Sequence, residues 1–176
     1  MLRRAFLFSL MAIALSFSNA FAQDKKDAMI DNSDKGKFQN VEVVPFTAQS
    51  DVKITPEQLK AITDSVVKEL QDTKKFKQVF REGETPTDAR APTLKITGTV
   101  VKFKAGSRAK RYLVGFGAGK SKVIANVQYI DNASGKVLAE HTSDGDVFMG
   151  VFGGDSGGAK SELAKDVAKF AKKTFF

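Results

Sequence analysis

The chain has 176 residues, with 28 lysines and arginines against 20 aspartates and glutamates, one histidine, no cysteine, and a formal net charge of +8. The lack of cysteine excludes a disulfide framework, a thiolate metal site and a cysteine nucleophile, and a single histidine excludes multi-histidine metal centres. Hydrophobic residues make up 42% and charged residues 27% of the chain, the composition of a globular domain rather than of a disordered one.

Residues 1–22 have the pattern of a secretory signal peptide. Arg3 and Arg4 supply the positive start, residues 5–17 form an apolar run, and Ala20-Phe21-Ala22 is a small-x-small cleavage site. The apolar run is shorter than the ~20 residues that a membrane span needs. We therefore expect cleavage after Ala22, a periplasmic or secreted protein, and no transmembrane span.

The segment that follows, residues 23–37, is polar and aperiodic, which predicts a flexible leader before one domain over 38–176. Residues 38–46 are rich in valine and phenylalanine and end at a proline, which predicts a strand. A helix is predicted to begin at Thr55, because a threonine cap, a proline and a glutamine three residues after the cap form a capping box.

The predicted helix continues with apolar residues at helical spacing, and Asp64 and Lys68 are spaced to pair on its polar side. Phe76, Val79 and Phe80 either close this helix or begin a short strand. The apolar residues that define the helical stripe are Leu59, Ile62, Val66 and Leu70.

Three further strands and a last helix are predicted in the second half of the chain. Residues 93–104 and 122–130 alternate apolar and polar residues, and Asp131-Asn-Ala-Ser-Gly135 has hairpin-loop chemistry before a partner strand at 136–142. Residues 158–174 have an apolar helical stripe and a lysine-rich outer face. This order predicts an α+β fold: a two-layer sandwich with a mostly antiparallel sheet and two helices packed on one face.

Several segments resemble the bacterial cell-envelope family catalogued as domain of unknown function 4410. They are VEVVPF, RAKRYLVGFGAGKSKVIANVQYID, DNASGKVLAE and the glycine-rich segment leading into SELAKDVAKF. Related strand–hairpin–strand units occur in envelope lipoproteins of the curli-secretion and penicillin-binding-protein-activator types, which implies a similar sandwich. The resemblance implies no enzymatic activity and no catalytic residue. Relatives of this kind are lipid-anchored, whereas this chain has no cysteine to carry a lipid.

Two segments resemble catalytic or nucleotide-binding motifs. Gly115–Ser121 is similar to a phosphate-binding loop, but its first glycine would stand at position 114, which is Val114, and a strand is predicted to follow where that motif needs a helix. Gly154-Asp-Ser156-Gly-Gly matches the nucleophile signature of trypsin-like proteases. A nucleotide-binding protein, or a serine hydrolase using Ser156 with His141, therefore remains an alternative.

The acids considered for that triad are Asp144 and Asp146, and the alternative interpretation makes His141 a half-buried structural residue and Asp155 or Ser156 a helix cap. Asp131, Asn132 and Ser134 begin like a calcium loop but lack its distal glutamate. We predict no metal, no cofactor and no catalytic residue.

Removal of Arg3 and Arg4 leaves 26 basic and 20 acidic residues, and residues 89–130 hold nine basic residues and no acidic one. The sequence thus predicts a non-catalytic accessory or binding module of the cell envelope that contacts a partner protein or an anionic surface, and not nucleic acid. The candidate basic patch is Arg108, Lys110, Arg111, Lys120 and Lys122. The candidate apolar surface on two glycine-rich loops is Tyr112, Phe116, Phe148 and Phe152.

Overall fold

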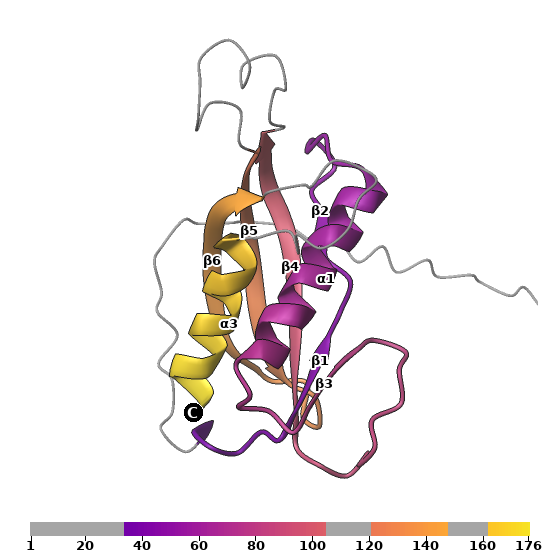
Figure 1. Cartoon of the computed structure of the whole chain (residues 1–176), viewed down its shortest axis with the longest axis vertical. Helices are drawn as coiled ribbons and strands as arrows, with labels where there is room; N and C mark the ends of the chain where they lie inside the picture. The colour runs from indigo at the N-terminus through magenta and orange to yellow at the C-terminus, as the bar shows by residue number, and fades with distance from the viewer. Residues whose placement is uncertain (1–33, 105–120, 148–161) are drawn as a thin grey trace, which may run out of the picture.

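The computed structural model describes residues 34–104, 121–147 and 162–176 (Figure 1). Within them one sheet of six strands has the order β3-β1-β4-β5-β6, with β2 pairing to β4, and both helices lie on the same side of this sheet. The elements are β1 (Asn40–Val43), β2 (Thr47–Ala48), α1 (Pro56–Asp72), β3 (Gln78–Arg81), β4 (Thr93–Lys104), β5 (Ser121–Asp131), β6 (Val137–Val147) and α3 (Glu162–Phe175).

The sheet is mixed, so the α+β class is confirmed but the prediction of a mostly antiparallel sheet is wrong. β1 runs parallel to β3 and to β4, and β2 runs parallel to β4. The pairs β4–β5 and β5–β6 are antiparallel. Helix α1 is the crossover that returns the chain beside β1 in the same direction. Residues 82–92 then carry it past β1, whose Asn40 side chain donates to the carbonyl oxygen of Asp88 at 3.2 Å.

Helix α1 begins as its sequence predicts. The Thr55 hydroxyl accepts from the Gln58 amide at 3.3 Å, and the Gln58 side chain accepts from the Thr55 amide at 2.9 Å, which completes the capping box. The predicted pair between Asp64 and Lys68 is not formed. Lys68 instead binds Asp72 at 2.7 Å, since residues four positions apart lie on the same face of a helix.

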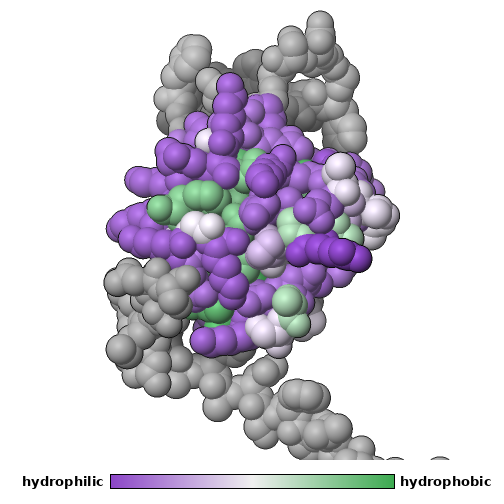
Figure 2. All heavy atoms as spheres, turned by 90° about the horizontal axis from the view of Figure 1, so that it is seen from below, coloured by the Kyte–Doolittle hydropathy of each residue, from purple (hydrophilic) through white to green (hydrophobic). Residues whose placement is uncertain are grey.

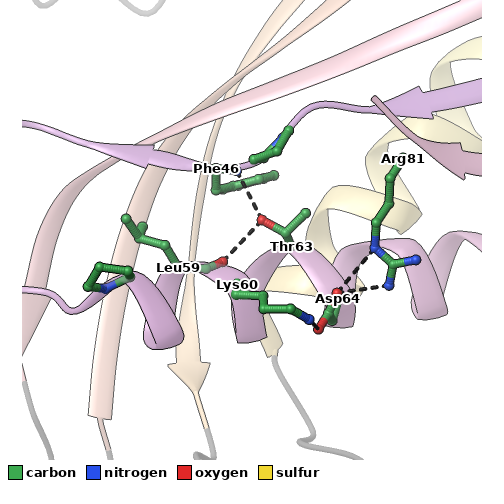
Figure 3. A pocket seen from close by; sticks show the side chains of 8 residues that line it. Phe46, Leu59, Lys60, Thr63, Asp64 and Arg81 are labelled. Atoms are coloured by element: carbon green, nitrogen blue, oxygen red, sulfur yellow. Dashed lines mark hydrogen bonds and ion pairs between the residues drawn. The ribbon is translucent and has the colours of Figure 1, made fainter. Parts of the chain in front are cut away.

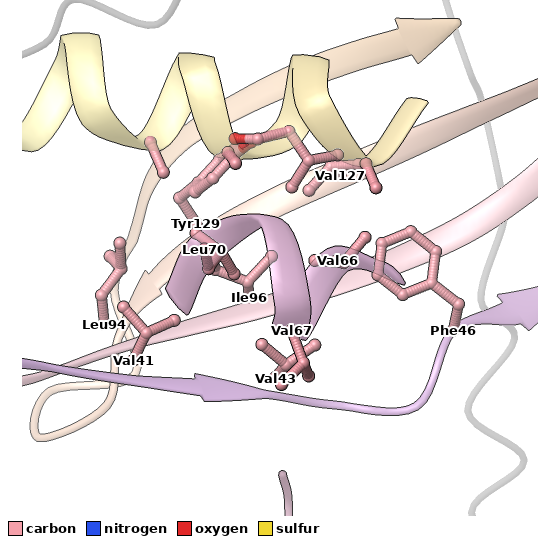
Figure 4. Close-up of a cluster of buried hydrophobic side chains, with 14 of the residues drawn as sticks. Val41, Val43, Phe46, Val66, Val67, Leu70, Leu94, Ile96, Val127 and Tyr129 are labelled. Atoms are coloured by element: carbon pink, nitrogen blue, oxygen red, sulfur yellow. The ribbon is translucent and has the colours of Figure 1, made fainter. Parts of the chain in front are cut away.

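The core lies between the sheet and the two helices (Figure 4). The alternating residues of β1, β4 and β5 that face the helices are fully buried, as the period of two predicts. Helix α1 contributes Val66 and Leu70 to this core, and α3 contributes Leu163, Val167 and Ala171. The buried strand residues are Val41, Val43, Leu94, Ile96, Val100, Val123, Ala125, Val127 and Tyr129.

The hairpin between β5 and β6 is also as predicted, with Gly135 at φ 70°. β6 extends five residues beyond the predicted end, to Val147. A bulge after Tyr129 shifts the register, so that Leu138 is buried and Val137 is 43% exposed. No helix among the described residues is long and apolar enough to cross a membrane.

Candidate functional site

A pocket of about 430 Å³ lies where the chain passes from β1 to β2 over the first half of α1 (Figure 3). Prolines 45 and 56 with Phe46 and Leu59 form its apolar wall. The ring of Phe46 reaches the core because position 98 on β4 is glycine, and a Cβ there would collide with that ring. The pocket is therefore shaped by a close approach between the β1–β2 connection and β4.

The polar groups of this pocket already have partners inside the protein. The Thr63 hydroxyl accepts from the Phe46 amide at 2.9 Å and donates to the Leu59 carbonyl oxygen at 3.0 Å. Asp64 binds Lys60 at 2.7 Å and Arg81 at 2.8 Å (Figure 3). The pocket can accept an apolar group, and its lining offers no free general base and no activated nucleophile.

The charges at the rim fix the ionisation of Asp64. Partial burial pushes the pKa of the Asp64 carboxyl group upward, but hydrogen bonds and charges from Lys60 and Arg81 outweigh burial and hold this pKa below its ordinary value. The same contact raises the pKa of Arg81. Asp64 is therefore a carboxylate that ties α1 to β3, and it is not placed to donate or accept a proton in catalysis.

His141 is half-buried on the helix-facing side of β6, which agrees with a structural role. Its Nε2 lies 2.8 Å from the Asp166 carboxylate, and its ring stacks on Phe170 with centroids 4.3 Å apart. Phe170 continues the aromatic contact to Tyr129 at 4.9 Å. Asp144 lies on the opposite face of β6 and approaches Lys122 at 4.0 Å, so it does not orient His141.

Asp166 is the partner that sequence reasoning missed, because a strand residue and a helix residue 25 positions apart meet only once α3 is packed on the sheet. Ser156, Asp155 and the side chain of Asp146 lie outside the described residues. Asp166 binds Nε2 and Phe170 covers one face of the ring, so these contacts hold His141 between β6 and α3. In a catalytic triad one ring nitrogen of the histidine binds an acid and the other faces the nucleophile, so the contact of Nε2 with Asp166 is compatible with that role as well.

Most of the remaining predicted site residues fall outside the described part of the chain. Lys122 is exposed on β5 and is the one member of the predicted basic patch that the structure describes. Residues 121–131 form a strand, so the helix that a phosphate-binding loop needs does not follow the glycine-rich segment. The predicted residues outside the described ranges are Arg108, Lys110, Arg111, Lys120, Tyr112, Phe116, Phe148 and Phe152.

Asp131, considered above as part of a calcium loop, has a structural partner. It accepts from Lys37 at 2.8 Å, and its other oxygen accepts from the amide of Ala133 at 3.0 Å. The Lys37 ammonium is the main cause that holds the pKa of Asp131 below its ordinary value. The carboxylate thus closes the hairpin loop and attaches the turn at residues 34–37 to it.

The chain is similar to several solved structures. A PelC dodecamer from Paraburkholderia phytofirmans matches over 80% of this chain and 91% of its own, with TM-score 0.51 and 16% identity. A second PelC dodecamer from the same organism, a point variant in another crystal form, covers 80% and 86% with TM-score 0.46 and 17% identity. Protein XCC0632 from Xanthomonas campestris, of family DUF330, covers 76% and 79% with TM-score 0.41 and 15% identity.

At these identities the likeness concerns the fold alone. No curated protein matches the chain. The family model described as "Domain of unknown function (DUF4410)" matches residues 21–150, which span the whole described sheet and helix α1. The chain therefore belongs to the DUF4410 family, as its strand and hairpin segments predict.

Proposed function

We propose that this chain is an exported, non-catalytic module of the bacterial cell envelope that works as a homo-oligomer and contacts a partner protein or an anionic surface. The observation that carries the proposal is the fold shared with one subunit of a PelC dodecamer over 80% of the chain. A fold that closes into a dodecamer in one protein supports self-assembly in another. The signal-peptide pattern of residues 1–22 supports export.

The sheet adds a physical reason for self-assembly. β6 is an eleven-residue strand at one edge of the sheet, with β5 as its one strand neighbour in the described part of the chain. A long edge strand presents unpaired backbone groups, and proteins cover such edges or use them for association. Exposed Glu140 and Asp144 on this edge disfavour disordered stacking and favour contact with a defined partner.

Native mass spectrometry of residues 23–176 tests the assembly, and fractionation of cells that express the full chain tests export. We expect a single closed oligomer and a periplasmic product that begins at Gln23. A monomer at all protein concentrations would contradict the proposed assembly. A product retained in the cytoplasm with residues 1–22 attached would contradict the proposed export. Crosslinking of the assembled protein in its own envelope then identifies the partner.

The serine-hydrolase alternative has one observation in its favour, the contact between His141 and Asp166. It is tested with a fluorophosphonate probe on the same preparation. Under the proposed function the protein is not labelled. Labelling that disappears in S156A would replace the proposed function with the hydrolase alternative.

A further inference from the structure

Helices α1 and α3 run in the same direction and end at the same end of the molecule (Figure 1). Their C-terminal segments meet there, because the ring of Phe76 packs edge-on against that of Phe176 with centroids 4.7 Å apart. Each of these phenylalanines stands in a lysine-rich stretch. The convergence therefore gathers cations that are about a hundred positions apart in the sequence.

We call the resulting surface the lysine end, and define it by Lys74, Lys75, Lys77, Lys169, Lys172 and Lys173. All six side chains are exposed. Figure 2 looks onto this end of the molecule, where hydrophilic residues cover most of the described surface and hydrophobic residues show in a few places between them. Phe176, 38% exposed, is one apolar side chain at this end.

The six lysines of the lysine end have no carboxylate partner among the described residues, which is also true of single lysines elsewhere such as Lys53 and Lys102, whereas five described lysines do have one. Lys60 and Lys68 on α1 bind Asp64 and Asp72, and Lys37 binds Asp131. Like charges gathered on one surface repel each other, so this arrangement costs stability unless an anion opposes it.

Helix capping accounts for part of the lysine end only. Lys172 and Lys173 lie in the last turn of α3, where cations favourably oppose the helix dipole. The last turn of α1 holds no basic residue, and Lys74, Lys75 and Lys77 come after that helix has ended. Helix capping thus leaves four of the six lysines, Lys74, Lys75, Lys77 and Lys169, without a role in the fold, and an external anion would give them one.

We propose that the lysine end docks the protein on an anionic lipid bilayer, with the ammonium groups at the headgroup phosphates and Phe176 at the boundary of the acyl region. Charge complementarity selects an anionic surface, and exposed lysines around an aromatic side chain are the pattern of an interfacial contact. The chain requires no membrane-spanning helix for this contact. The inference rests on the proposed function, because it names the anionic surface and the part of the molecule that meets it.

The test measures binding of residues 23–176 to vesicles made of equal amounts of phosphatidylglycerol and phosphatidylcholine, by co-sedimentation. Two double variants, K172Q/K173Q and K74Q/K75Q, remove two charges from each half of the lysine end. The matched control, K53Q/K102Q, removes two exposed charges that have no carboxylate partner among the described residues and lie toward the opposite end of the molecule, before α1 and near the end of β4. K74Q/K75Q removes no ion pair and no charge from a last helical turn, so it should keep the thermal unfolding midpoint of the parent chain, whereas K172Q/K173Q should lower the midpoint slightly because both charges oppose the dipole of α3.

We expect each lysine-end variant to bind about 25-fold more weakly, which corresponds to about fivefold for each of the two lysines lost, and the control to change little. Binding should fall as the salt concentration rises and be absent on vesicles of phosphatidylcholine alone. Glycerol phosphate at low concentration should not compete, since a bilayer presents many phosphates at once. Equal binding by the parent and both lysine-end variants, or an equal loss in K53Q/K102Q, would overturn the inference.

Native mass spectrometry of the same samples separates this inference from the proposed function. An oligomer that does not bind anionic vesicles contradicts the lysine end and leaves assembly intact. A monomer that binds them through the lysine end contradicts assembly and supports the inference. Variants that bind weakly because they no longer assemble would also overturn the direct role assigned to the lysines.

Discussion

The ring of Phe46 packs directly over Gly98, in the space that the Cβ of any other residue at position 98 would occupy. Phe46 is 3% exposed and also lines the pocket above α1. One glycine on β4 therefore sets both the packing of the β1–β2 connection and the shape of the pocket.

We expect G98A to lower the free energy of unfolding by about 1–3 kcal/mol, since a methyl group forces the Phe46 ring out of a well-packed position. Urea unfolding followed by circular dichroism measures this. The smaller side chain of F46L relieves the collision, so G98A/F46L should lose less than the sum of the two single variants. Strictly additive losses would mean that the two residues do not share this contact.

Alanine substitutions at Gly145 and Ser143, two positions apart on β6, are expected to have different effects on stability. A Cβ at Gly145 would collide with the backbone of Glu162 and Leu163 at the start of α3. Because a backbone cannot yield as a side chain can, G145A should destabilise the protein by about 1–3 kcal/mol and increase hydrogen exchange in the first described turn of α3.

At Ser143 the hydroxyl group is fully buried and has no hydrogen-bond partner among the residues that the structure describes. Removing a buried, unsatisfied polar group is favourable, so S143A should leave stability unchanged or raise it. Thermal unfolding of both variants under one set of conditions tests the pair. A loss in S143A as large as that in G145A would show that the Ser143 hydroxyl makes a stabilising contact.

The difference in stability between the parent chain and D64N should depend on pH. The folded-state pKa of Asp64 lies below the ordinary value of 3.8, so the carboxylate stabilises the folded state above that value and loses the contribution as pH falls through the folded-state pKa. D64N should lower the free energy of unfolding by less than about 1 kcal/mol at neutral pH, because Asp64 is more than one third exposed.

The difference between D64N and the parent should disappear in acid, where both side chains are neutral. Urea unfolding at a series of pH values measures it. D72N is the matched control, since Asp72 forms one exposed pair with Lys68 on the same helix. A difference between D64N and the parent that persists undiminished below pH 3.8 would contradict the charge-based explanation.

Because the Tyr129 hydroxyl group is buried, the protein should lose stability in alkali. This hydroxyl group donates to the carbonyl oxygen of Val167 at 3.0 Å, and burial raises the pKa of Tyr129 well above its ordinary value of 10.0. Between the unfolded and folded pKa values the unfolded chain releases a proton that the folded chain retains, so stability falls as pH rises.

We expect Y129F to cost about 1 kcal/mol near neutral pH through the lost hydrogen bond. Above pH 10 the parent should lose stability more steeply than Y129F, because the variant has no proton to release at this position. Parallel pH dependences in alkaline urea titrations would show that Tyr129 ionises equally in the folded and unfolded states.

Local sequence patterns predicted the parts of the fold that local chemistry determines. The capping box at Thr55, the alternation of β4 and β5, and the left-handed conformation at Gly135 each depend on residues within one turn or one strand. The direction of a strand relative to its neighbours does not depend on such local residues. The connection over residues 82–92 is long enough for a hairpin or for a crossover past β1, and its hydrogen bond from Asn40 is visible only in the folded chain.

The candidate surfaces divide in the same way. The alternation of β6 placed His141 on the half-buried face, but its contact with Asp166 requires α3 to be packed against the sheet. The lysines of α3 were predicted to be exposed, and they are. Their proximity to Lys74, Lys75 and Lys77 follows from the shared direction of the two helices, which no spacing within either helix encodes.

That shared direction has a consequence for the proposed oligomer. Rotation about the axis of a cyclic ring carries the lysine end of one subunit to the same height and radius in every other subunit. Contacts that are individually weak then act together, since the first one raises the local concentration of phosphate around all the others. A ring of this protein would attach to a bilayer by avidity, and a lone subunit would dissociate readily.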